Sequence, residues 1–166
     1  KNDNKIGYFK VEILKAFGPY FFEDKQKLLC LTSSLKLIKI LTVEAETNEK
    51  IFNLLDALFE ILISDEWIKK YIFWELNLLK YTGYDLNLEK IVKIEITDEK
   101  KRYFVESKTE KKYVPNFLIE LDLDENNLNN LKAGLVIVGD YLDKSILRPN
   151  NLIYPIDRTN FINSLK

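Results

Sequence analysis

The fold is decided by the stretch Trp67-Ile68-Lys69-Lys70-Tyr71-Ile72-Phe73-Trp74-Glu75-Leu76-Asn77-Leu78-Leu79-Lys80-Tyr81-Thr82-Gly83-Tyr84, which contains both tryptophans of the chain. At about 100° per residue it forms two apolar stripes, side by side on one helix. The stripes consist of Trp67, Tyr71, Trp74, Leu78 and Tyr81, and of Ile68, Ile72, Leu76 and Leu79. We expect only Glu66, Lys69, Lys70, Phe73, Asn77 and Lys80 to face water. A helix with so wide an apolar face packs on several sides, so this stretch predicts the central core helix.

Both ends of this helix carry boundary signals. Asp65 is expected to be the N-cap, because its carboxylate can accept hydrogen bonds from the first free amides. Gly83 is expected just beyond the last turn, where a left-handed conformation costs glycine no Cβ clash. The helix is therefore predicted from Glu66 to about Tyr81. Its structural residues are expected to be Trp67, Tyr71, Trp74, Glu75, Leu78, Leu79 and Gly83.

Glu75 is the one acid that points into the apolar arc, where an isolated carboxylate would be costly. One interpretation is a structural glutamate that is satisfied by a helix N-terminus or by an arginine. The other is a catalytic acid with a perturbed pKa. The structural interpretation is preferred, because the chain lacks the companion residues that acid–base catalysis needs.

Composition limits the function classes. The 166 residues are 46% hydrophobic and 31% charged, as expected for one globular domain with a sizeable core. The net charge of −1 means that any nucleic-acid binding must come from a local patch. The apolar runs are too short for a membrane span and no secretory signal opens the chain, so we expect a cytoplasmic protein without membrane contact.

Several kinds of chemistry are excluded by missing residues. Histidine is absent and Cys30 is the single cysteine, which rules out nitrogen–sulfur zinc sites and Ser-His-Asp or Cys-His nucleophiles. No phosphate-binding or dinucleotide glycine motif occurs. We therefore expect no enzymatic activity and no cofactor or metal.

The N-terminal part reads as a strand followed by two helices. Residues 6–13 predict an isolated strand that ends at Gly18-Pro19, which suggests a preceding β domain. Asp24 is expected to cap a helix that ends near Leu41, with its main apolar row at Leu28, Leu31, Leu35 and Ile38. Lys25, Lys36 and Lys39 lie towards one side of it and form either a solvated face or a phosphate-tracking surface.

The next helix is predicted from Glu49 to Ile63, capped by Thr47 or Asn48. Its buried stripe is expected to be Ile51, Leu55, Leu58 and Leu62. Its outer face carries Glu49, Asn53, Asp56 and Glu60, which would repel DNA.

After Gly83 the pattern changes from helical to alternating. Residues 88–97 and 101–107 predict two strands, and Tyr113-Val114 a third short one, which together form a small β insert at about 88–114. The lysines of this insert and Arg102 form either a basic patch or a surface that only serves solubility. Residues 126–131 predict a short helix and 131–147 a longer one, with an apolar row at Leu135, Val138, Leu142 and Ile146. Gly134 and Gly139 permit close packing, and a terminal helix follows Pro155. The predicted fold is mainly α with a small β insert, a helical bundle around the Trp/Leu-rich helix.

The stretch from Trp74 to Tyr84, followed by Leu88, resembles the aromatic-Glu-Leu-x-Leu-Leu…Gly-[Tyr/Phe]…Leu signature of RecO, the bacterial recombination mediator family. Residues 7–12 look like the last strand of the family's oligonucleotide-binding (OB) barrel. Residues 135–142, Leu147, Pro155 and 158–165 look like the closing helices of alphaproteobacterial-type members. The resemblance implies that residues 1–15 end an N-terminal OB-fold domain, and that 16–166 form the helical C-terminal domain.

Two positions depart from the family pattern. Many RecO proteins begin a zinc site with Cys-x-x-Cys just after this signature, whereas Ile91 and Ile94 occupy those positions here. The resemblance therefore implies that the metal is lost and that apolar packing holds the β insert. Asn77 replaces a basic residue that is often found in the signature, which weakens any DNA contact there.

The resemblance implies a non-enzymatic role at the bacterial nucleoid. RecO proteins bind single- and double-stranded DNA, anneal complementary strands and associate with RecR. They also engage the acidic, hydrophobic C-terminal tail of single-stranded-DNA-binding protein, and so help to load RecA. The alternative is a protein-interaction scaffold whose DNA affinity belongs to the barrel domain.

The candidate DNA- or partner-binding residues are Lys25, Lys36, Lys39, Phe73, Lys144, Arg148 and Arg158. Phe73 lies on the polar side of the core helix, so it either contacts a partner or is buried by another part of the chain. Arg148 and Arg158, with Lys144 and Lys166 nearby, could clamp a phosphate or a carboxylate. Alternatively, at least one of these arginines pairs with Glu75 or Asp157.

Overall fold

A computed structural model describes residues 10–13, 16–97, 100–106, 110–120 and 127–166 of the chain. The helices are α1 (Lys25–Leu41), α2 (Glu49–Ile63), α3 (Trp67–Tyr81), α4 (Leu88–Ile91), α5 (Leu128–Tyr141) and α6 (Ile156–Ser164). The strands are β1 (Lys93–Thr97), β2 (Lys100–Glu106) and β3 (Lys111–Val114). Short 3₁₀ turns are η1 (Gly18–Phe21), η2 (Asn116–Leu118) and η4 (Arg148–Asn150), and η3 (Leu142–Leu147) is π-helical. The predicted class, a mainly helical fold with a small β insert, is confirmed.

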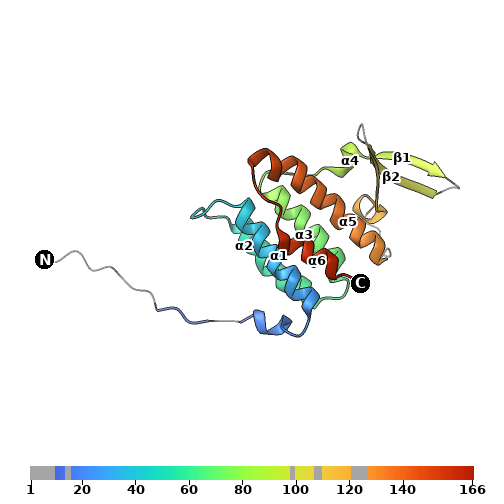
Figure 1. The fold of residues 1–166 in the computed structure, drawn as a ribbon. Helices are drawn as coiled ribbons and strands as arrows, with labels where there is room; N and C mark the ends of the chain where they lie inside the picture. The colour runs from blue at the N-terminus through green and yellow to red at the C-terminus, as the bar shows by residue number, and fades with distance from the viewer. Residues whose placement is uncertain (1–9, 14–15, 98–99, 107–109, 121–126) are drawn as a thin grey trace.

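The central position of α3 is confirmed. It contacts α1, α2 and α5, and Figure 1 shows it between the α1–α2 pair and α5. Gly83 has a φ of 87°, and the amides of Gly83 and Tyr84 bond back to Lys80 O and Leu79 O at 3.2 and 2.8 Å. These two bonds form the Schellman motif that ends the helix.

Three details of α3 were predicted wrongly. Tyr81, which was placed in the apolar stripe, is 40% exposed at the end of the helix. The N-cap of α3 is Glu66 in a left-handed conformation (φ 57°), not Asp65, so the helix begins at Trp67. Lys69, expected in water, is only 2% exposed, and its Nζ lies 5.5 Å from the ring centroid of Phe117. Since η2 lies over this side of α3, the lysine stem is covered by a segment 48 residues further along the chain.

The cap of α1 is confirmed, but its buried face differs from the prediction. Asp24 accepts hydrogen bonds from the amides of Gln26 and Lys27, both at 3.1 Å. Leu35 is 47% exposed, whereas the small residues Cys30, Ser33 and Ser34 are fully buried. This narrow face contacts α6, because small side chains let the two helices come close together.

Helix α2 follows its prediction closely. Asn48 caps it by accepting from the amide of Ile51 at 3.1 Å. Ile51, Leu58 and Leu62 are buried, with Leu54 as the fourth fully buried position and Leu55 only half-buried. The acidic outer face at Glu49, Asn53, Asp56 and Glu60 is exposed as expected.

The β insert is a three-stranded antiparallel sheet in the order β1-β2-β3. Its first segment was predicted as a strand from residue 88, but Leu88–Ile91 forms one helical turn capped by Asn87. The sheet is anchored to the body by Tyr103 and Val114, which are 5% and 3% exposed. Beyond this anchor, the β1–β2 hairpin extends away from the helices (Figure 1).

The C-terminal half is a nearly continuous helical path. α5 passes into the π-helical η3, and Leu135, Val138, Leu142 and Ile146 are all buried as predicted. Both close-packing glycines are confirmed. A Cβ on Gly134 would lie 2.9 Å from the Phe117 ring, and one on Gly139 would overlap a guanidinium nitrogen of Arg158.

The N-terminal strand prediction covers residues 6–13. Residues 6–9 lie outside the described part of the chain. Residues 10–13 are not in a strand, and the side chains of Val11 and Ile13 are 88% and 84% exposed. Gly18-Pro19 begins the 3₁₀ turn η1. The assignment of residues 1–15 to the end of a preceding domain stays a prediction.

Candidate functional site

Glu75 forms a buried ion pair with Arg158. Arg158 Nε donates to Glu75 Oε1 at 2.9 Å and its NH2 donates to Oε2 at 2.7 Å, while NH2 also donates to Leu135 O at 2.7 Å. Tyr71 donates its hydroxyl proton to Glu75 Oε1 at 2.8 Å. The two charged side chains are 2% and 0% exposed. The structure confirms the sequence-based interpretation that an arginine satisfies Glu75.

The ionisation of this cluster fits a structural role. Burial raises the pKa of the Tyr71 hydroxyl well above its ordinary value and Glu75 raises it further, so the proton stays on the tyrosine. Burial opposes the charge of Arg158, but Glu75 raises the pKa of Arg158 above its ordinary value. Arg158 is thus a permanent, fully buried cation that contacts no solvent. The prediction that Arg158 binds a phosphate is therefore wrong, because its guanidinium group is buried and already bound to Glu75 and Leu135 O.

The other predicted site residues lie on separate surfaces. Lys25, Lys36 and Lys39 are exposed along α1, and Lys144 is exposed on η3. Arg148 NH2 contacts Asp143 Oδ2 at 2.6 Å and keeps 71% of its side chain exposed. Phe73 is half-buried, with its ring edge-to-face on Phe117 at 6.1 Å between centroids. The structure therefore does not bring these residues into one site, and much of the Phe73 ring is covered from within the chain.

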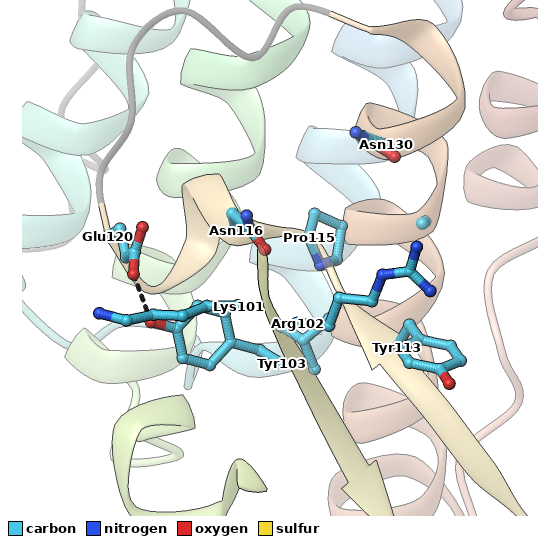
Figure 2. A pocket seen from close by; sticks show the side chains of 10 residues that line it. Lys101, Arg102, Tyr103, Tyr113, Pro115, Asn116, Glu120 and Asn130 are labelled. Carbon is cyan, nitrogen blue, oxygen red and sulfur yellow. Dashed lines mark hydrogen bonds between the residues drawn. The ribbon is translucent and has the colours of Figure 1, made fainter. Parts of the chain in front are cut away.

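A polar cleft lies where the sheet meets the helical body, and it contains Lys101 and Arg102 of the β insert. It has a volume of about 610 Å³ and is lined by residues of β2, β3, η2 and the first turns of α5. Figure 2 shows Lys101, Arg102, Asn116 and Asn130 around it. The residues that line the cleft come from several separate segments of the chain. One signal for them is visible in the sequence, since the alternation of side chains along β2 places Lys101 and Tyr103 on the same side of that strand.

The floor of the cleft carries a hydrogen-bonded pair, Tyr103 and Glu120, and its rim carries two cations. Tyr103 donates its hydroxyl proton to Glu120 Oε1 at 2.5 Å, and this hydrogen bond raises the pKa of Tyr103. Lys101 and Arg102 are exposed, and within the described part of the chain neither makes an ion pair. Arg102 lies opposite Glu95 in the sheet, where Lys111 and then Arg102 lower the pKa of the Glu95 carboxyl group. Since neither Lys101 nor Arg102 is held in an ion pair within the described ranges, both can bind an external anion without breaking one.

A second, mainly apolar pocket lies between the β insert and helices α4 and α5. It has a volume of about 240 Å³ and is lined mainly by side chains of α4, α5 and the sheet, among them Leu88, Val105, Val114 and Ile137. Lys144 lies at its border, and within the described ranges it makes no ion pair. Lys112, also at this border, pairs with Asp140 and Glu110. The pocket combines an apolar interior with one available ammonium group.

The residues at the family's zinc positions do not fit a metal. Ile91 and Ile94 carry no ligand atoms, and their side chains are 47% and 59% exposed. Among the described residues, no group of three potential metal ligands occurs. Apolar packing holds the insert as expected, but through Leu88, Tyr103 and Val114.

In the described ranges, no helix is both long and apolar enough to cross a membrane.

Comparisons with known proteins point to one family. Residues 23–151 match the family model described as "Recombination protein O C terminal". The chain is similar to the DNA repair protein RecO of Rhodospirillum centenum, with 24% identity over 172 residues that cover 95% of this chain and 68% of that protein. It is also similar to the DNA repair protein RecO of Rickettsia africae, with 39% identity over 85 residues that cover 51% of this chain and 36% of the relative. No solved structure is matched.

Proposed function

This chain belongs to the RecO family of DNA repair proteins through its C-terminal domain, and we propose from this premise that it acts as a non-enzymatic recombination mediator at the bacterial nucleoid. In this role it would bind single- and double-stranded DNA and promote the annealing of complementary strands. Together with RecR and single-stranded-DNA-binding protein, it would help to load RecA. The chain spans only part of its relatives, so the whole activity is a proposal for this domain.

The polar cleft carries the DNA-binding part of the proposal. Lys101 and Arg102 are its uncommitted cations, while most other cations of the sheet already pair with carboxylates. Phosphate binding by a domain of net charge −1 requires such a local excess. The acidic outer face of α2 lies elsewhere on the helical body, so it supports an orientation in which DNA approaches from the sheet side.

A charge-reversal experiment tests this assignment. The double variant Lys101→Glu/Arg102→Glu should bind labelled single-stranded DNA more weakly in fluorescence-anisotropy titrations. The slope of log K against log salt should become shallower by about 0.7 for each phosphate that the variant no longer neutralises, and so by about 1.4 for two phosphates.

The matched comparison is Lys36→Glu/Lys39→Glu, which makes the same charge change on α1. We expect this variant to keep most of its affinity and its salt slope. If the α1 variant lost binding and the cleft variant did not, DNA would follow the lysine row that the sequence predicted. Absence of binding by the wild-type chain at low salt would remove DNA binding from this domain.

The alternative function, a protein-interaction scaffold, is supported by the apolar pocket. An acidic, hydrophobic peptide such as the tail of single-stranded-DNA-binding protein has the two features that this pocket accommodates. An apolar side chain would fill the cavity, and a carboxylate would bind Lys144 at its border.

This docking predicts a specific loss. Lys144→Glu should weaken binding of the tail peptide by about fivefold, which corresponds to about 1 kcal/mol for an exposed ion pair. Arg148→Glu is the matched charge reversal, because Arg148 is exposed nearby and already pairs with Asp143. Isothermal titration calorimetry with the tail peptide measures the affinity of each variant. Equal losses in both variants would indicate a general field effect and not docking at the pocket.

A further inference from the structure

The outer face of the β sheet carries aromatic side chains that the core does not use. Side chains alternate along a strand, so Arg102 and Phe104 lie on the face opposite to Tyr103, which is buried against the helical body. The strand register places Phe104 opposite Tyr113 of β3. Figure 2 shows Arg102 and Tyr113 extending to the same side of the strands, away from Tyr103. Both also line the polar cleft, so this face adjoins it.

Phe104 and Tyr113 form an accessible aromatic pair. Their ring centroids are 6.4 Å apart with an interplanar angle of 61°. Tyr113 is 52% exposed, and Phe104 is half-buried. Neither ring belongs to the core, but the Lys111 ammonium lies over the Phe104 ring, so Tyr113 provides most of the aromatic surface that faces the solvent.

Charged side chains surround this aromatic pair, and the one that makes no ion pair in the described part of the chain is the cation Arg102. Lys111 Nζ lies 4.0 Å from the Phe104 centroid and 5.3 Å from that of Tyr113, and it contacts both carboxylate oxygens of Glu95 at 3.1 Å. Lys93 pairs with Glu106 at 2.6 Å in the same way. Both carboxylates on this face therefore already have a lysine partner. Arg102 lies opposite Glu95, whose pKa is lowered by Lys111 and then by Arg102, but it makes no ion pair within the described ranges.

We propose that this outer face is a stacking platform for the unpaired bases of single-stranded DNA. A base stacks on the exposed ring of Tyr113, beside Phe104, and Arg102 binds a phosphate of the same strand. Stacking on an aromatic side chain is tolerant of sequence because every base has a π face. In a duplex those base faces are covered by neighbouring bases, so the platform selects single strands. The inference rests on the proposed function and adds the base-contacting surface to it.

The test compares two oligonucleotides with the same phosphates. One is a labelled oligothymidine and the other has abasic sugars in place of the thymidines. The wild-type chain should prefer the base-containing strand by about tenfold. Tyr113→Ala should lose this preference by binding the oligothymidine about tenfold more weakly, while its affinity for the abasic strand and for duplex DNA stays unchanged.

Two further variants exclude trivial causes. Tyr113→Leu keeps an apolar contact for Phe104 but removes the ring, so it should behave like Tyr113→Ala. Tyr20→Ala removes an aromatic side chain of 67% exposure from η1, far from the sheet in sequence, and should behave like the wild type. Circular dichroism confirms that each variant is folded.

Each other outcome overturns the platform. If the Tyr113 variants bind both strands like the wild type, bases do not stack there, although the proposed function stands. If they lose equal affinity for both strands, Tyr113 contacts the backbone and not the bases. If the wild-type chain binds neither strand, the platform and DNA binding by this domain fail together.

Discussion

Replacing Arg158 by leucine should lower the free energy of unfolding by about 3–5 kcal/mol, because the change leaves Glu75 as an unpaired charge in the core. Glu75 is 2% exposed, so water cannot replace the missing guanidinium. The carbonyl of Leu135 would lose its charged donor as well. Urea denaturation monitored by circular dichroism measures the change in stability.

Arg148 provides the matched control for this variant. Its ion pair with Asp143 leaves 71% of the arginine side chain exposed, so Arg148→Leu should cost less than about 1 kcal/mol. The double variant Glu75→Leu/Arg158→Leu should be more stable than Arg158→Leu alone, since it removes both buried charges together. Equal stabilities for Arg158→Leu and Arg148→Leu would show that the buried pair contributes no more to stability than the exposed one.

Trp74→Ala should lower the free energy of unfolding by a similar amount, about 3–5 kcal/mol, for a different reason. Trp74 is 1% exposed, stacks on Tyr71 at 5.6 Å and donates its indole proton to Leu54 O at 2.7 Å. Truncation would leave a large cavity between α2 and α3 and an unpaired carbonyl. Both effects destabilise the folded state.

The other tryptophan serves as its control. Trp67 is only half-buried at the beginning of α3, 6.0 Å from the ring of Phe161, so Trp67→Ala should cost clearly less than Trp74→Ala. Since the chain has only these two tryptophans, each variant also reports on the remaining one by fluorescence during the same urea titration. A greater destabilisation by Trp67→Ala would mean that the centre of the core lies nearer the start of α3.

Elements set by local chemistry were predictable from the sequence. Asp24 and Asn48 accept hydrogen bonds from amides two or three residues away, so their caps depend on neighbours that the sequence displays. Gly83 is a similar case, because its positive φ requires only a residue without a Cβ. The boundaries of α1 and α2 followed from these signals.

Tertiary contacts explain where the predictions failed. The helical pattern of α3 predicts that Lys69 faces water. Only the folded structure shows that Phe117 covers its side chain. Leu35 belongs to a regular apolar row, but the contact with α6 selects the narrow face around Ser33 instead. Residues 88–91 have strand-like composition, yet Asn87 caps them into a helical turn.

The candidate site was less predictable than the fold. The need of Glu75 for a cation could be deduced from one helix, whereas the choice of Arg158 depended on where the last helix packs. The polar cleft was not predicted, because its cations are next to each other on a strand and its other walls come from η2 and α5. The aromatic pair on the sheet depends on a strand register that the sequence pattern does not specify.

The separation of Glu75 from Arg158 also affects how the protein is made. The two residues are 83 positions apart, and ribosomes add roughly 5 to 20 residues per second. The glutamate is therefore synthesised roughly 4 to 17 seconds before the arginine that neutralises it. During that interval Glu75 lacks its guanidinium partner, so burying the apolar side of α3 around this carboxylate costs more free energy than in the folded protein. We therefore expect the nascent chain to leave that apolar side exposed for longer. Translation speed and chaperone binding should then influence the yield of folded protein more strongly than they would for a core without charges.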